Sequence, residues 1–140
     1  MANKPSGWGG DVAIKDVTFL NTVADVNLFT VTGDVIMRII AVCKTDLTSA
    51  GACNASVGIT GETAAFIALT DVTTIDADEV WAAAAPATKL TVMTGTPQAG
   101  MVVTTSNTVK LTRTAQIDAG RIVFYAIWTP LSTNGNVVAA

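Results

Sequence analysis

The amino-acid sequence predicts an all-β protein, a β-sandwich or jelly-roll-like fold with about eight strands and flexible termini. Short apolar runs rich in β-branched residues recur along the chain, and turn residues separate them at intervals of roughly 8–15 residues. Threonine, which favours strands over helices, is abundant throughout. Two runs, 35–42 and 121–129, are apolar on both sides of an extended chain. At 140 residues the chain is expected to form one domain.

The N-terminal part of the chain is predicted to lie outside the sandwich. Residues 1–15 are expected to form an arm that begins MANKPSGWGG, and the sandwich domain is assigned to residues 16–130. Proline and glycine make this arm flexible, and its Trp8 is either an anchor on a neighbouring subunit or an aromatic that touches nothing. Weak alternation over 11–23 predicts the first strand, which overlaps the end of the arm.

The central strands are predicted on either side of a tight turn at Gly33, a residue that can adopt a positive φ at low cost. This turn is expected to join a strand at 28–31 to a strand at 35–43 as a hairpin. The second strand is interrupted by Arg38, whose guanidinium requires an acidic partner or a path to water. A strand that is apolar on both faces needs cover on its outer face, and another subunit is the candidate for that cover.

Between these strands and the last one the pattern is mixed. The segment 64–69 fits either a strand or one helical turn. Over 70–85, Asp76 and Glu79 have capping-box spacing before an apolar run, yet we favour extended or irregular structure over a short helix there. A turn is expected at 115–120. Further strands are expected to end at Ile59 and to cover 89–93, 100–104, 107–112 and 121–129.

The chain ends in a segment that Pro130 separates from the last strong strand. Residues 131–140, LSTNGNVVAA, are expected to form a C-terminal tail that can reach a neighbouring subunit. The tail carries two apolar candidates for such a contact, Val137 and Val138. Both lie outside the strands predicted to form the core.

Composition excludes several partners. Charged residues make up 14% of the chain, against roughly 25% in typical soluble domains, and the mean hydropathy is +0.49. A monomer so poor in charge would expose large apolar patches. Because no apolar run approaches the ~18 residues of a membrane span, the excess indicates subunit interfaces and no membrane partner. The net charge of −3 without a basic cluster argues against nucleic acid. The first ten residues lack the apolar segment of a secretory signal.

The chain contains no histidine, which removes Ser-His-Asp triads, Cys-His dyads and histidine-containing zinc sites. No cofactor or metal is assigned. Cys43 and Cys53 flank the loop KTDLTSAGA, at the ends of two strands that are expected to pair. They are either a disulfide that closes this loop or two buried, reduced thiols, since a protein assembled inside a cell starts out reduced.

The only dense acidic group comprises Asp71, Asp76, Asp78 and Glu79. These carboxylates could ligate Ca²⁺ from a loop, but the glycine and the distal glutamate of an EF-hand loop are missing, and a solvated turn is the alternative. Aromatic residues are 6% of the chain and are scattered. A glycan-binding cleft around Trp8 or Trp81 and a carboxylate pair for glycoside hydrolysis are therefore disfavoured, and the protein is not expected to be an enzyme.

The strand pattern resembles that of small structural proteins of tailed-phage virions, in particular head decoration (cement) proteins. The resemblance covers most of residues 16–138, whereas Cys43 and Cys53 match no motif of that family. It is carried by LFTVTGDVIMRI (Leu28–Ile39), ASVGITGETAAFIALT (Ala55–Thr70), TTIDADEVW (Thr73–Trp81) and AGRIVFYAIWTPLSTNGNVV (Ala119–Val138).

The resemblance implies a homotrimeric all-β module on the exterior of a capsid, assembled in the host cytoplasm. Such a module ties neighbouring major-capsid subunits together and carries no catalytic residues. On this reading Trp8, Val137 and Val138 are the expected contacts to the capsid or to a neighbouring subunit. The alternative is a domain of a phage tail or receptor-binding fibre that recognises a host surface glycan. A repetitive shaft or an aromatic-lined pocket would favour the fibre, and the sequence shows neither.

Overall fold

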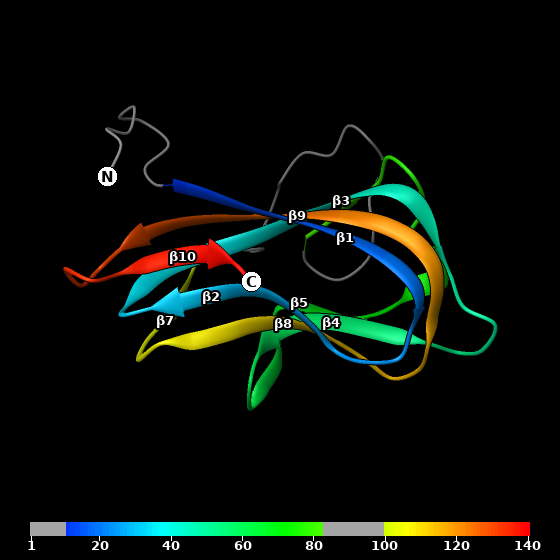
Figure 1. Cartoon of the computed structure of the whole chain (residues 1–140), viewed down its shortest axis with the longest axis horizontal. Helices are drawn as coiled ribbons and strands as arrows, with labels where there is room; N and C mark the ends of the chain where they lie inside the picture. The colour runs from blue at the N-terminus through cyan, green and yellow to red at the C-terminus, as the bar shows by residue number, and fades with distance from the viewer. Residues whose placement is uncertain (1–10, 83–99) are drawn as a thin grey trace.

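The computed structural model describes residues 11–82 and 100–140, and within them it confirms the predicted all-β sandwich. Ten strands in these ranges form two antiparallel sheets that lie over one another (Figure 1). The first sheet contains, in spatial order, β1 (Asp11–Thr22), β9 (Ile117–Pro130), β3 (Val35–Thr48) and β6 (Val80–Trp81), with β7 (Met101–Val103) also paired to β3. The second sheet contains β10 (Asn136–Ala139), β2 (Val26–Thr32), β8 (Asn107–Arg113), β4 (Asn54–Ile59) and β5 (Glu62–Asp71). A short 3₁₀ helix, η1 (Val72–Thr74), follows β5.

The two longest strands, β3 and β9, form the centre of the first sheet. Their register runs unbroken from Val35 opposite Pro130 to Cys43 opposite Ile122. From Val35 to Cys43 every second residue of β3 is buried and the residues between them are half-buried, which is the two-residue period of a strand with one face on the core. The two runs predicted as strong strands are therefore confirmed.

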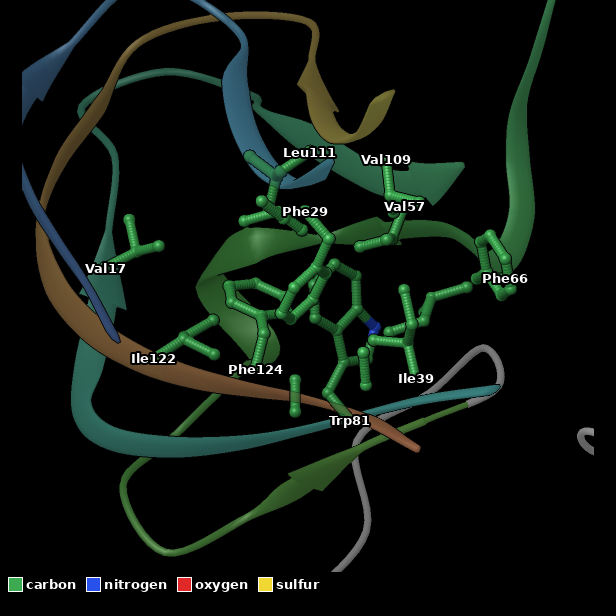
Figure 2. Packing of buried hydrophobic residues seen from close by; sticks show 14 of the residues in the cluster. Val17, Phe29, Ile39, Val57, Phe66, Trp81, Val109, Leu111, Ile122 and Phe124 are labelled. Atoms are coloured by element: carbon green, nitrogen blue, oxygen red, sulfur yellow. The ribbon is translucent and has the colours of Figure 1, made fainter. Parts of the chain in front are cut away.

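The core lies between the sheets and is built from the inward faces of both. Figure 2 shows Trp81 and Phe124 of the first sheet extending toward Phe29 and Leu111 of the second. The rings of Trp81 and Phe124 meet edge to face, with centroids 6.4 Å apart and planes at 65°. Burying an aliphatic or aromatic side chain of this size contributes roughly 1.5–3 kcal/mol, so this layer is the main stabilising feature of the fold.

The expected hairpin between 28–31 and 35–43 is wrong, although the turn itself is present. Gly33 has φ +64° between β2 and β3. However, β2 pairs with β8 and β10 in the second sheet, whereas β3 pairs with β9 in the first. The turn at Gly33 therefore carries the chain from one sheet to the other and does not close a hairpin.

The boundaries of both terminal segments are also corrected. β1 begins at Asp11 and pairs with β9 from its first residue, so residues 11–15 belong to the sandwich and not to an arm over 1–15. At the other end, residues 136–139 form β10, which pairs with β2. The segment 131–140 is thus a turn and an edge strand, not a flexible tail outside the domain.

The described part of the ambiguous segment, residues 70–82, is extended or irregular apart from the single 3₁₀ turn of η1, as favoured. Asp76 and Glu79 make the contact that their spacing predicts, since the N–H of Asp76 donates to Oε2 of Glu79 at 3.0 Å. The N–H of Glu79 also donates to the carbonyl oxygen of Asp76, which closes a turn and starts no helix up to residue 82. The segment 64–69 is part of strand β5. The strand expected at 89–93 lies outside the described residues.

Candidate interaction surface

The outward face of the first sheet is apolar over most of its area. Side chains that point outward from β1 alternate with buried ones, and Val12, Ile14 and Leu20 are 55%, 54% and 78% exposed. The register places Val12 beside Ile127, and Ile127 in turn beside Arg38 of β3. We call this surface the outer face; its apolar members are Val12, Ile14, Leu20, Ile36, Ile40, Val42, Val80, Val102, Val123, Tyr125 and Ile127. Val12, Ile14, Leu20 and Val102 are exposed, Val123 is buried, and the other six are half-buried.

Arg38 lies half-buried in the middle of the outer face. Across residues 11–82 and 100–140 no acidic group pairs with its guanidinium. The sequence required either an acidic partner or a path to water for this guanidinium. Its partial exposure provides the path to water. The long side chain can cover apolar neighbours with its methylenes while the guanidinium stays hydrated.

An ion pair between Asp16 of β1 and Arg121 of β9 lies on the outer face, between the positions of Ile14 and Leu20 along β1. The guanidinium of Arg121 donates from Nε to Oδ1 of Asp16 at 2.9 Å and from Nη2 to Oδ2 at 2.6 Å. This two-point contact holds the pKa of Asp16 below its ordinary value and raises the pKa of Arg121. Both side chains are about half exposed, so solvent screens the pair and its stabilising effect is small.

The edge of the sandwich at β1 borders a groove. β1 and β10 are edge strands of the two sheets, and an open groove of about 350 Å³ lies between them. Its lining comes from Asp11–Ile14 of β1, from Asn136–Ala139 of β10 and from Trp128. Nζ of Lys15 donates to the carbonyl oxygen of Ala140 and links the two strands.

The three residues predicted as contacts have different positions. Val138 is 48% exposed and lines this groove. The prediction that Val137 is a contact residue is corrected, because its side chain is 4% exposed and belongs to the core between the sheets. Neighbouring residues of a strand point to opposite faces, so only one of the pair can face outward. Trp8 lies outside the described residues.

Both cysteines are free and buried. Of the two alternatives, this agrees with two reduced thiols and not with a disulfide between Cys43 and Cys53. The disulfide expectation depended on pairing of their strands, and that pairing is absent: Cys43 lies in β3 of the first sheet, and Cys53 precedes β4 of the second. Each thiol donates to a backbone carbonyl, Cys43 to Thr45 at 3.1 Å and Cys53 to Ala115 at 3.2 Å. Burial raises the pKa of Cys43 to about 11.

The acidic group does not converge on one point. Asp71 accepts the N–H and the hydroxyl of Thr73 and so caps η1, while Glu79 accepts the N–H of Asp76. Within the described ranges no three His, Cys, Asp or Glu side chains are placed to hold a metal ion. Trp81, the other aromatic considered for glycan binding, is fully buried. The side chains of Asp71, Glu79 and Trp81 thus each make a hydrogen bond within the fold.

The strand expected over 11–23 is confirmed by β1, but residues 1–15 were also assigned to a flexible arm, so exposed Val12 and Ile14 were not identified as part of a surface. The signal that could have found them is the alternation of DVAIKDV, in which apolar side chains fall on both faces. None of the described helical structure is long and apolar enough to cross a membrane. Comparisons of the chain with protein-family models, with curated proteins and with solved structures found no match.

Proposed function

We propose that this protein is a decoration protein of a tailed-phage head, a homotrimer that binds the outside of the capsid and ties major-capsid subunits together. The observation that carries the proposal is the outer face, an apolar sheet surface on a chain with 14% charged residues. A subunit interface removes such a surface from water, and closed rings are the usual form of homo-oligomers. The resemblance to decoration proteins supplies the partner.

The proposed mechanism is mechanical and not chemical. A packaged genome pushes capsid subunits apart, and a clamp bound across their junctions opposes this force. A ligand that binds only the assembled shell stabilises it by RT ln(1 + [L]/Kd), about 2.7 kcal/mol per site at a hundredfold excess over Kd. Over many identical sites even a weak clamp is protective.

The contact residues that we propose differ in part from the sequence expectation. Val138, exposed at the edge of the second sheet, remains a proposed contact, and so does Trp8. Val137 is withdrawn because it is a core residue. The outer face around Arg38 and Val102 takes its place as the surface that subunits bury against one another.

Light scattering on the purified protein tests the assembly. We expect a trimer at micromolar concentration, and we expect Val102→Asp to weaken it by placing a charge on the outer face. The matched control is Leu131→Asp, since Leu131 is equally exposed (57% against 59%) but lies in the turn after β9. A stable monomer, or equal effects of the two variants, contradicts the proposed interface.

Particles that lack the protein test the function. We expect them to release DNA at a lower temperature than complete particles, and mass spectrometry should count hundreds of copies in the complete ones. Unchanged heat resistance together with failure to adsorb to cells would overturn the decoration proposal. That result would favour the alternative, a tail or fibre domain that recognises host glycan.

A further inference from the structure

The turn between β9 and β10 contains an Asn-Gly pair, Asn134 followed by Gly135. The side-chain amide of an asparagine can be attacked by the main-chain nitrogen of the next residue. Glycine hinders this attack least, because it has no Cβ. No other asparagine in the sequence precedes a glycine. The side chain of Asn134 is exposed, so water reaches the pair.

The reaction of such a pair requires no enzyme and no co-reactant except water. The nitrogen of Gly135 loses its proton to solvent and bonds to Cγ of Asn134, and the side-chain nitrogen takes up a proton and leaves as ammonia. The product is a five-membered cyclic imide. Water then opens this ring at either carbonyl and gives aspartate or isoaspartate. Isoaspartate carries the main chain through its side-chain carboxyl and so adds one methylene to it.

The folded turn engages both reacting groups. The N–H of Gly135 donates to the carbonyl oxygen of Ser132 at 3.0 Å, so the attacking nitrogen is already hydrogen-bonded. The hydroxyl of Ser132 donates to Oδ1 of Asn134 at 2.8 Å. That oxygen also packs against Gly33, where an added Cβ would lie 2.5 Å from it. Attack on the side-chain amide therefore requires that the turn first opens.

The turn is fastened to the turn between β2 and β3, which lies at the same end of the sandwich (Figure 1). The N–H groups of Leu131 and Ser132 donate to the carbonyl oxygen of Asp34 at 2.9 and 3.2 Å, and the N–H of Asp34 donates to Oγ of Ser132 at 2.9 Å. Beyond the turn, β10 is a four-residue edge strand that pairs with β2. A short edge segment of this kind can open locally at a lower free-energy cost than global unfolding.

We propose that Asn134 is a deamidation site whose reaction is controlled by local opening of the β9–β10 turn and of β10. The folded turn protects the asparagine, and each opening exposes it to attack.

The two products have different consequences for the fold. Aspartate keeps the length of the main chain and can accept the same hydrogen bond from Ser132. Isoaspartate lengthens the chain beside Gly135, where even an added Cβ would lie 2.6 Å from the carbonyl oxygen of Asp34. The turn has no room for another methylene, so β10 stays detached from β2 and Val137 leaves the core. The isoaspartate reaction thus makes a reversible opening permanent.

This inference goes beyond the proposed function and does not rest on it. The reacting groups and the contacts that restrain them belong to one chain, so neither the trimer nor the capsid is required. Failure of the capsid experiments would leave the deamidation site unchanged, and its own failure would leave the outer face as the proposed subunit contact.

Mass spectrometry of the full chain during incubation in mildly alkaline buffer tests the site. Fragment spectra distinguish Asn134 from Asn136, which lies in β10 before a valine and is the internal control. In denaturant, Asn134 should convert many-fold faster than Asn136. In the folded protein, Asn134 should convert at least about tenfold more slowly than in denaturant, because the rate follows the population of the open form. Equal rates for Asn134 in both conditions, or no preference for Asn134 in denaturant, would overturn the proposal.

Three variants distinguish local opening from global unfolding. Val137→Ala weakens the attachment of β10 to the core and should speed the conversion of Asn134 in the folded protein several-fold, whereas Val138→Ala, exposed on the same strand, should not. Thr70→Val removes the bond to Trp81 and weakens the fold outside β10, so it should also leave the rate unchanged. If Thr70→Val speeds the reaction as much as Val137→Ala, or if Val137→Ala has no effect, local opening does not control the site.

Hydrogen exchange tests the consequence of the reaction. Protein is aged until Asn134 has converted, and the aspartate and isoaspartate forms are separated by chromatography. The isoaspartate form should exchange the amides of residues 136–139 several-fold faster than the unaged chain, because β10 is detached. The Asn134→Asp variant has the other product at this position and should exchange them at the unaged rate. Equal exchange in all three would mean that β10 closes over the modified turn, and the permanent release of β10 would be wrong.

Discussion

The indole Nε1 of Trp81 donates a hydrogen bond of 3.0 Å to Oγ1 of Thr70, and the bond lies inside the sandwich. Trp81 belongs to β6 of the first sheet and Thr70 to β5 of the second, so this bond joins the two layers. Trp81 is fully buried and Thr70 is 7% exposed. A polar contact at this depth fixes the rotamer of the largest side chain of the core.

Replacing Thr70 with valine tests that bond. The substitution keeps the shape of the side chain but removes the hydroxyl, which accepts from Trp81 and donates to the carbonyl oxygen of Ala68 at 2.9 Å, so we expect the free energy of unfolding to fall by about 1–3 kcal/mol. Thr70→Ser keeps the hydroxyl and should recover most of this loss. Urea denaturation followed by tryptophan fluorescence measures both. If valine is as stable as threonine, the bond contributes nothing to stability.

Much of the fold could be predicted from local sequence. The runs around Ile39 and Phe124 are long, apolar and β-branched, and both became central strands of the first sheet. The turn at Gly33 was also predicted correctly. Partners of strands could not be predicted in this way. β3 pairs with β9, and the paired residues are between 95 positions (Val35 and Pro130) and 71 positions (Thr48 and Ala119) apart in the chain. Adjacency along the sequence suggested β2 instead.

The candidate surface was predicted less well for a related reason. VVAA at the end of the chain has no alternation, so nothing local tells Val137 from Val138. Only pairing with β2 decides which valine enters the core. Likewise, the glycines before Asp11 suggested an arm, and the partner that makes 11–15 a strand is β9, at the far end of the sequence.

The ion pair between Asp16 and Arg121 predicts a defined pH dependence. The pKa of Asp16 is lowered in the folded state, so the pair stabilises the protein above the ordinary aspartate value of about 4. That contribution should disappear as the pH falls below 4 and through the lower folded pKa. In thermal unfolding we expect the Tm of the wild type to fall as the pH decreases from 7 to 2. The Tm of Asp16→Asn should fall by less, because the variant has no ion pair to lose. Asp25→Asn serves as the control. Parallel curves for wild type and Asp16→Asn would show that the exposed pair is fully screened.

The two buried thiols should resist labelling in the folded protein. Burial raises the pKa of Cys43 to about 11, so the thiol stays protonated near neutral pH and reacts poorly as a nucleophile. We expect a thiol reagent to label neither cysteine until denaturant is added and then to label two per chain without reductant. Leu20→Cys, whose position is 78% exposed, should add one thiol that reacts at once. No reactive thiol after denaturation would mean that Cys43 and Cys53 are oxidised.

Gly120 should not tolerate a side chain. Its φ is +124°, and a Cβ there would meet Cδ2 of Leu47 and lie 2.7 Å from the carbonyl oxygen of Asp46. Gly120→Ala is expected to cost about 2–3 kcal/mol from backbone strain and overpacking. Gly51→Ala is the control, since nothing lies within 4 Å of its Cβ position, and it should change stability by less than about 0.5 kcal/mol. Similar melting temperatures for the two variants would show that the chain relaxes around Gly120.

The neighbouring valines of β10 provide a matched pair for the last prediction. Val137 is 4% exposed in the core, and Val138 is 48% exposed beside the β1 groove. Val137→Ala should cost about 1.5–3 kcal/mol, because it removes buried apolar volume, whereas Val138→Ala should change the free energy of unfolding by less than about 0.5 kcal/mol. Chemical denaturation measures both. Since opposite faces of a strand alternate with a period of two, the reverse order of costs would mean that β10 pairs with β2 one residue out of the observed register.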